Sequence, residues 1–133
     1  MSVAVLIRDG PLAERPPELP LQQDGAVGAR IVFEGIVRRR EDDADIEALD
    51  YEVYEPMASR ELRQLGETAL RDFGLFAVVV EHSRGRVPVG RPSFRLCIAS
   101  CHRKEGLSAM DWFIDRLKED VPIWKSVAGS QTG

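Results

Sequence analysis

The run Leu75–His82 (LFAVVVEH) constrains the fold more than any other segment, because its first six side chains are all apolar. A strand without a polar face has to be covered on both sides, which places it in the interior of a sheet. The β-branched segment Ser2–Arg8 and the segment Ser93–Cys101 also have strand character and can supply neighbours. The sequence therefore predicts a sheet with Leu75–His82 at its centre.

Two amphipathic helices are expected to cover this sheet. The first follows Pro56, which suits a first helical turn, and Gly74 is well placed to end it. Its apolar side chains recur every three or four residues and form one stripe, made of Ala58, Leu62, Leu65, Ala69 and Phe73. The second runs from about Lys104 to Asp120 and stops before Pro122; its expected stripe is Leu107, Met110, Ile114, Leu117 and Val121.

The remaining segments complete an α+β domain. We expect strands at Gly28–Arg38 and Ile46–Tyr54, an exposed loop in the charge run Arg38–Asp45, and a turn at Arg84–Gly90. Prolines between positions 11 and 20 predict a loop with at most one short helical turn. No internal boundary is visible, so the prediction is one domain over 1–133, with helices packed on a mixed or antiparallel sheet.

Composition narrows the classes of function. A net charge of −4 gives the whole protein no general attraction to nucleic acid or anionic membranes. No apolar run reaches the ~18 residues of a membrane span, and the N-terminus lacks the basic segment of a signal peptide. Cys97 and Cys101 would lie ~13 Å apart on one strand, too far for a disulfide, and two cysteines are too few for structural zinc. These features predict a cytoplasmic protein.

Basic residues at the ends of predicted elements are candidate anion-binding groups. Arg38 ends a strand. His102 and Arg103 stand at the junction into the last helix, where free N–H groups and the helix dipole attract anions and disfavour cations. For each of these residues taken alone, a solvated surface position is the plainer interpretation.

Lys118 and Lys125 are the candidates for direct participation in chemistry. Lys118 lies at the edge of the apolar stripe of the last helix, so its stem can lie on apolar surface while its ammonium enters a cleft; ordinary exposure is the alternative. Lys125 follows the apolar tail Val121–Trp124, which we expect to dock and hold it. An ammonium held in place can serve as an acid, a base or a nucleophile.

Four segments form a pattern that is highly specific when they occur in this order and spacing. They are Gly28–Arg38, Leu49–Ala58, Ala99–Arg103 and Leu117–Lys125. Through them the chain resembles the large, catalytic subunits of molybdopterin synthases, the MoaE family, over almost its whole length. Other enzyme signatures are absent from the sequence, including a Walker loop, a dinucleotide-binding glycine motif and a nucleophile elbow.

The resemblance implies an α/β-hammerhead-like fold and a homodimer at the centre of a heterotetramer. Each end would bind a small ubiquitin-like sulfur-carrier subunit whose C-terminal Gly-Gly bears a thiocarboxylate. The sulfur would convert cyclic pyranopterin monophosphate to molybdopterin in molybdenum cofactor biosynthesis, with no metal and no organic cofactor. The site residues carried over are Lys118 and Lys125 as catalytic residues, and Phe33, Arg38, His102 and Arg103 as substrate-binding residues.

Two expectations about geometry follow from that resemblance. Arg38 of one subunit should meet His102 of the other, which makes the site composite. The glycine tail of the carrier should enter a narrow channel that ends near the two lysines, with a lining that includes Phe33, Met110, Ile123 and Trp124.

Two departures from the family pattern keep alternative hypotheses open. The chain has His82-Ser83-Arg84-Gly85 where the family usually has His-Arg-x-Gly, and Ser126 where it commonly has a basic residue. One alternative is a non-catalytic relative that only binds the carrier, and the other is a domain that binds a phosphate ligand. The retention of Lys118 and Lys125 favours the enzyme over the first, and the apolar tail before Lys125 favours it over the second.

Overall fold

A computed structural model describes residues 2–17 and 25–128 of the chain. Its elements follow the order of the sequence, with two long helices among short and long strands. They are β1 (Ser2–Asp9), β2 (Ala29–Ile36), β3 (Arg40–Glu41), β4 (Ala44–Asp45), β5 (Ala48–Val53), α1 (Met57–Phe73), β6 (Ala77–Pro88), β7 (Pro92–Ser100), α2 (Arg103–Asp120) and β8 (Ile123–Val127).

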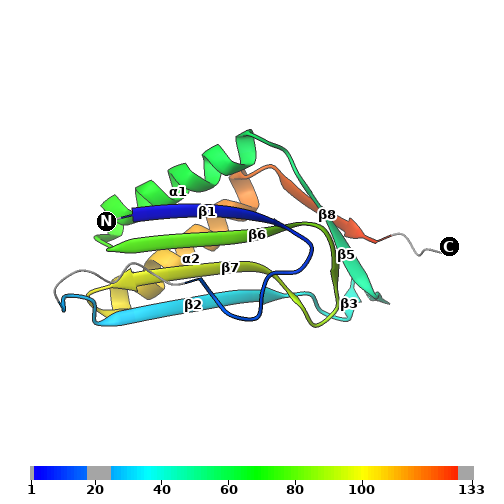
Figure 1. The fold of residues 1–133 in the computed structure, drawn as a ribbon, viewed down its shortest axis with the longest axis horizontal. Coiled ribbons are helices and arrows are strands. Elements are labelled where there is room, and N and C mark those ends of the chain that lie inside the picture. The colour runs from blue at the N-terminus through cyan, green and yellow to red at the C-terminus, as the bar shows by residue number, and fades with distance from the viewer. Residues whose placement is uncertain (1, 18–24, 129–133) are drawn as a thin grey trace.

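The main sheet is organised around β6. Its strand order is β2-β7-β6-β5-β8, and β1 also pairs with β6 (Figure 1). The pairing of β1 with β6 is parallel and the other pairings are antiparallel, so the sheet is mixed. Because β6 contacts β1, β7 and β5, the prediction that Leu75–His82 lies at the centre of the sheet is confirmed.

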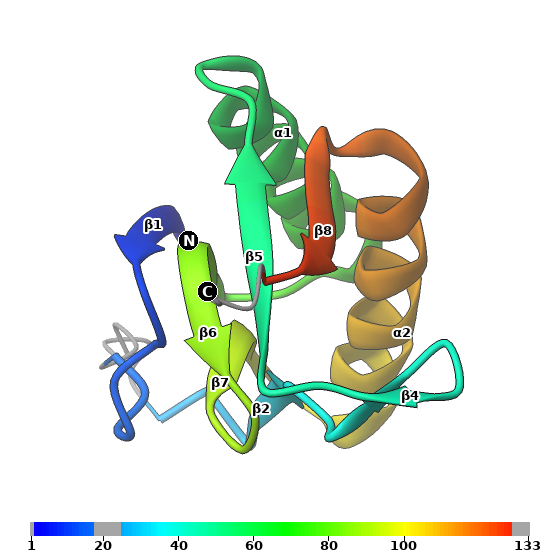
Figure 2. The ribbon, with the colours of Figure 1, turned by 90° about the vertical axis from the view of Figure 1, so that its right-hand side faces the viewer.

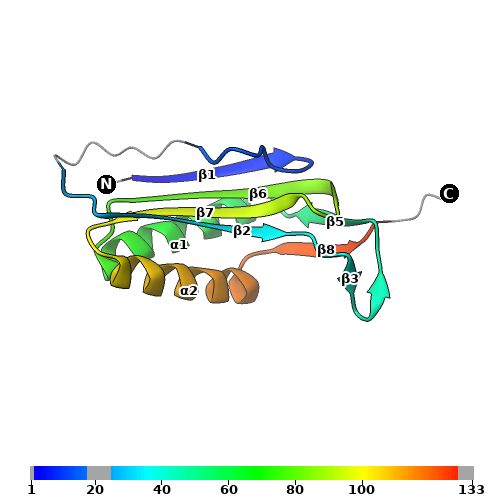
Figure 3. The same cartoon turned by 90° about the horizontal axis from the view of Figure 1, so that it is seen from below.

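Both helices cover one face of this sheet, while the segment after β1 lies on the other face (Figure 3). The α+β class predicted from the sequence is confirmed. Each helix approaches the sheet through a glycine: a Cβ added to Gly66 would lie 2.6 Å from Val3 Cγ1, and one added to Gly106 would lie 2.6 Å from Ile31 Cδ1. A larger side chain at either position would therefore force the helix away from the sheet.

Helix α1 agrees with its predicted apolar stripe, since Ala58, Leu62, Leu65 and Ala69 are buried. Gly74 adopts the left-handed conformation (φ 67°), and its N–H donates to the carbonyl of Leu70. That conformation is cheap for glycine and ends the helix where the sequence indicates. No helix in the described ranges is long and apolar enough to cross a membrane.

The stripe predicted for α2 was wrong at Leu107, whose side chain is 51% exposed. The residues that α2 buries include Gly106, Ala109 and Phe113. The helix therefore faces the sheet about one position earlier than a stripe of large side chains suggests. Its first turn packs through a glycine, and a stripe of large side chains cannot reveal a contact of that kind.

Three segments are more ordered than the sequence predicted. The expected turn Arg84–Gly90 is wrong, because β6 continues as a strand to Pro88 and pairs there with β5. The charge run Arg38–Asp45 contains the β3–β4 hairpin, in which Arg40 pairs with Asp45. The residues after Pro122 form β8, a strand antiparallel to β5, rather than an irregular tail.

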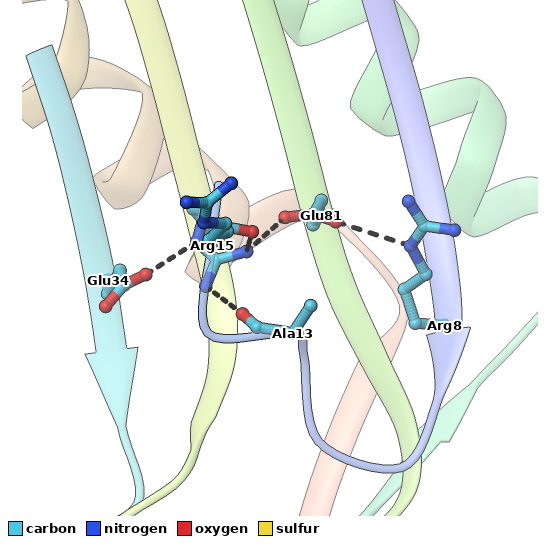
Figure 4. A network of polar contacts seen from close by, with 6 residues as sticks. Arg8, Ala13, Arg15, Glu34 and Glu81 are labelled. Carbon is cyan, nitrogen blue, oxygen red and sulfur yellow. Dashed lines mark hydrogen bonds and ion pairs between the residues drawn. The ribbon is translucent and has the colours of Figure 1, made fainter. Parts of the chain in front are cut away.

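A ladder of charged side chains crosses four strands on the sheet face away from the helices (Figure 4). Arg95 of β7 is fully buried and pairs at 2.6 Å with both Glu34 of β2 and Glu81 of β6. Glu81 also accepts from Arg8 of β1 at 3.3 Å. We call these four residues the charge ladder. Their register positions are adjacent, since Arg95 lies opposite Glu34 on one side and Glu81 on the other.

The charge ladder also fastens the segment that follows β1. The guanidinium of Arg95 donates to the backbone carbonyls of Ala13 and Arg15. Those carbonyls belong to a proline-rich stretch without helix or strand, so Arg95 supplies partners that secondary structure does not. The segment in turn covers Arg95 and removes it from water.

The two cysteines differ in environment, and this predicts different reactivity. Cys97 is buried in β7, and burial raises the pKa of its thiol to about 11. Cys101 is exposed, and both thiols are free. Because the thiolate is the reactive form, we expect a thiol reagent at neutral pH to label Cys101 and leave Cys97 unmodified until the protein unfolds. Mass spectrometry of labelled peptides from native and denatured protein measures this, and fast labelling of both thiols in the native state would contradict it.

Candidate active-site cleft

A cleft of about 410 Å³ opens where one end of the sheet meets the C-terminal half of α2. Its walls come from the end of β2, from β5 and β8, and from the last turns of α2. Figure 2 shows β5 and β8 side by side near α2. The β3–β4 hairpin contributes Glu41 to the same wall.

Three cations, here called the cationic rim, lie around this cleft: Arg38, Lys118 and Lys125. Arg38 follows β2, where the strand ends. Lys118 lies in the last turn of α2, one turn after Ile114, and the half-buried Ile114 and Leu117 hold that turn against the domain. Lys125 lies opposite Tyr51 in the β5–β8 register, so both side chains point to the cleft side of the sheet.

Lys125 is held in place by a partner that the sequence did not indicate. Its ammonium lies 2.9 Å from Glu41 Oε2, and the side chain of Lys125 is 51% exposed. A half-exposed ion pair of this kind contributes little stability, at most about 1 kcal/mol. Its main effect is therefore to fix the position of Lys125. Glu41 was missed because its segment was expected to be a solvated loop.

A second group of residues, here called the cleft floor, is uncharged and more deeply buried: Tyr51, His82, Ser93 and Phe94. The hydroxyl groups of Tyr51 and Ser93 lie 2.9 Å apart and share a hydrogen bond. The His82 ring packs edge-on against Tyr51 at 5.2 Å between centroids and lies 5.9 Å from Phe94. Phe33, a predicted substrate-binding residue, extends this row of rings with its centroid 6.1 Å from that of Phe94.

His82 is neutral in this environment. Burial lowers the pKa of its imidazole below the usual value, and the hydrogen bond to Ser83 offsets this only in part. The Nδ1 atom lies 2.8 Å from the carbonyl oxygen of Ser83, which can only accept. Nδ1 must then carry the proton, which leaves a lone pair on Nε2. The sequence held one clue to this position: Val78, Val80 and His82 alternate onto the same face of β6.

His102 and Arg103 do not lie in the cleft of the same chain. They stand at the start of α2, and Lys118 near its end is about 24 Å further along the helix axis. The side chain of His102 is 78% exposed. Hydrogen bonds from the backbone N–H groups of Glu105 and His102 lower the pKa of Glu105, so a carboxylate of the chain itself already serves the N-terminus of this helix.

The predicted channel lining is correct only in part. Phe33 and Ile123 line the cleft together with the two lysines. Met110 instead belongs to the hydrophobic core, and it is 7% exposed. Trp124 points away from the cleft and is 54% exposed, because it alternates with Ile123 and Lys125 along β8.

The arrangement of these charges defines what the cleft can do. The cationic rim can attract an anionic group to a protein whose overall charge is negative. The cleft floor can take an uncharged, flat group next to the lysines. Among the residues that the structure describes, no three His, Cys, Asp or Glu side chains gather into a possible metal site.

The fold and the cleft place the chain in the structural class of the molybdopterin synthases. It is 28% identical to a structure described as molybdopterin synthase from Staphylococcus aureus, with a TM-score of 0.78 over 96% of this chain and 91% of that one. A complex of subunits 1 and 2 of molybdopterin-converting factor from Helicobacter pylori gives 30% identity and a TM-score of 0.74, over 92% of this chain and 83% of that one.

Sequence comparison identifies the family. The model of the MoaE protein family matches residues 15–120, and the chain belongs to this family. It is 39% identical to the molybdopterin synthase catalytic subunit of Dictyostelium discoideum over 77% of this chain and 66% of that protein. With the subunit of the same name from Arabidopsis thaliana the identity is 40%, over 74% of this chain and 50% of that protein. The chain thus spans about half to two thirds of these relatives.

Proposed function

We propose that this protein is the catalytic subunit of a molybdopterin synthase. It takes sulfur from the thiocarboxylated C-terminus of a small carrier protein and transfers it to cyclic pyranopterin monophosphate. The observation that carries the proposal is the convergence of Arg38, Lys118 and Lys125 on one cleft in a member of the MoaE family. Neither a metal nor an organic cofactor is required, because the sulfur arrives on the carrier.

The residues have separate roles in this proposal. Lys118 participates directly, as the acid or base that moves a proton during sulfur attack on the pterin side chain. Lys125, held by Glu41, positions and polarises the reacting group and stabilises developing negative charge. Phe33 and Arg38 contact the substrate: the guanidinium suits a phosphate, and the ring suits a flat heterocycle.

The partner in this proposal is a small ubiquitin-like protein with a Gly-Gly tail. A thiocarboxylate is anionic, so the cationic rim attracts it. Glycines lack side chains and can enter a cleft too narrow for larger residues. The complex of two subunits known from Helicobacter pylori supports such a pairing for a similar chain. We place the assembly, a heterotetramer around a homodimer, in the cytoplasm.

The distance between the two groups of cations supports a homodimer with a composite site. His102 and Arg103 lie at the far end of α2 from the cationic rim, so they can serve the same substrate only if a second copy supplies them. In this arrangement they hold the phosphate end of the substrate that reacts beside Lys118 of the other copy.

A composite site predicts complementation between inactive variants. Arg38→Ala and His102→Ala homodimers should each lose most of their activity. After the two proteins are mixed, unfolded and refolded together, about half of the dimers are mixed, and in each of these one of the two sites has both residues. Because active sites then make up about a quarter of the total, we expect roughly a quarter of the wild-type rate. A mixture no more active than either variant alone would contradict the shared site.

The function itself is tested by reconstitution. Purified protein is combined with thiocarboxylated carrier and cyclic pyranopterin monophosphate, and molybdopterin is measured as its fluorescent oxidation product. Formation of product supports the proposal. Carrier binding without turnover would favour a non-catalytic relative, and binding of the phosphorylated pterin without carrier binding would favour a phosphate-ligand domain. A carrier with a bulky last residue should fail to deliver sulfur, because it cannot enter the cleft.

A further inference from the structure

His82 is a polar group in the cleft to which the proposed function has so far given no role. Its side chain continues the row of Val78 and Val80 on the helix-covered face of β6, at the point where that row leaves the core and reaches the cleft. A valine-like residue would complete the core there. The presence of an imidazole therefore calls for an explanation in terms of the cleft.

The free nitrogen of His82 faces the cleft. Nδ1 is occupied by the Ser83 carbonyl, and no described residue bonds to Nε2. Among the described side-chain nitrogen and oxygen atoms, only Ser83 Oγ is both fully buried and unpaired, so Nε2 keeps contact with solvent. His82 is 6% exposed and lines the cleft, and solvent reaches it from that side. Nε2 is thus a hydrogen-bond acceptor directed into the cleft.

The surroundings of Nε2 indicate what kind of group it accepts from. The nearby side chains of the cleft floor, Tyr51, Ser93 and Phe94, are uncharged, whereas the cations of the cleft lie at its rim. An anionic thiocarboxylate gains most by staying beside Lys118 and Lys125. The aromatic rings of Phe33, Phe94 and Tyr51 offer flat surfaces on which another flat ring can pack.

The geometry points to His82 as a substrate-recognition residue that accepts a hydrogen bond at Nε2 from a ring N–H of the pterin. This inference rests on the proposed function, because it names a contact for the same substrate in the same cleft. A backbone N–H of the carrier tail offers the same donor chemistry, and the experiment separates the two sources. The contact fixes which edge of the heterocycle lies against the cleft floor and so orients the side chain that receives sulfur.

The test compares variants that keep or remove the acceptor. His82→Gln places an amide oxygen near the position of Nε2, whereas His82→Phe keeps the ring packing and removes the acceptor. His82→Leu is a second, smaller variant without an acceptor, in case the phenyl ring disturbs folding. Ser83→Ala is the matched control, because Ser83 is the neighbouring residue on the opposite face of the strand and its hydroxyl has no partner. Melting temperatures establish that each variant is folded.

Two measurements are made on each variant. The first is the Kd of a stable pterin with a phosphorylated side chain, followed by pterin fluorescence without carrier. The second is the steady-state rate with thiocarboxylated carrier and cyclic pyranopterin monophosphate, together with the Kd of the carrier. We expect His82→Phe and His82→Leu to raise the pterin Kd and the KM by about 10–100-fold, as for a buried donor left unpaired. His82→Gln and Ser83→Ala should stay within about fivefold of the wild type, and kcat and carrier affinity should change little in all of them.

Several results would overturn the inference. An unchanged pterin Kd in both His82→Phe and His82→Leu would show that Nε2 makes no contact with the heterocycle. Weaker carrier binding with unchanged pterin binding would assign Nε2 to the tail instead. Failure of the proposed function looks different: the wild type would form no molybdopterin, whereas the pterin titration would still report on His82.

Discussion

Replacement of Lys118 by alanine should abolish sulfur transfer while leaving the fold intact. Loss of a directly participating acid or base lowers the rate by about 10²–10⁴. The Lys118 side chain lies at the surface of the last turn of α2, beside the half-buried Leu117 and Ile114, so truncation removes an ammonium and a stem rather than core packing. Stability should fall by no more than about 1 kcal/mol, the usual value for a cation near a helix C-terminus.

The measurement is kcat under saturating carrier and pterin, with the melting temperature recorded for the same sample. Arg116→Ala is the matched control, because Arg116 is also a cation on the last turns of α2 but pairs with Asp120 and does not line the cleft. It should keep nearly full activity. Near-normal turnover of Lys118→Ala at an unchanged melting temperature would remove Lys118 from the mechanism.

Replacement of Arg95 by methionine should cause the largest loss of stability. The substitution leaves Glu81, whose side chain is 4% exposed, without its buried partner at 2.6 Å. Breaking a buried ion pair on one side costs about 3–5 kcal/mol, because the remaining charge stays out of water. The carbonyls of Ala13 and Arg15 would also lose their donor. For a domain of this size, we expect the melting temperature to fall by about 10–20 °C.

A second variant separates the lost charge pair from the lost side-chain volume. Arg95→Met combined with Glu81→Leu removes both charges and should recover much of the stability, because an apolar pair can replace a buried ion pair. Arg84→Ala breaks the exposed pair of Arg84 with Asp9 and should change stability by less than about 1 kcal/mol. If Arg95→Met melts within about 2 °C of the wild type, the charge ladder does not stabilise the domain as described.

The elements that the sequence predicted best are those whose burial follows from one segment alone. Leu75–His82 has no polar face and is central, and the stripe of α1 with Gly74 at its end is buried as expected. The resemblance to the MoaE family placed Phe33, Arg38, Lys118 and Lys125 together, and the structure brings these four to one cleft. The roles assigned to them remain predictions.

What the sequence could not show depends on pairing between distant segments. Arg95 and Glu81 look like ordinary charges in two separate strands, and only the β6–β7 register places them opposite each other. The extension of β6 through Arg84–Pro88 depends on pairing with β5, since its own residues resemble a turn. Glu41 contacts Lys125 only because a short hairpin folds back on β8.

The alternation of side chains along β8 has a consequence for how the protein would lose activity on heating. The strand has five residues, and β5 is the strand with which it pairs. Short strands at a sheet edge open locally at a fraction of the free energy of global unfolding. A shift of one residue against β5 would turn Lys125 outward and Trp124 inward, while the two helices and the central strands stay as they are. Thermal inactivation could then begin as fraying of this strand, well below the temperature at which helical structure is lost.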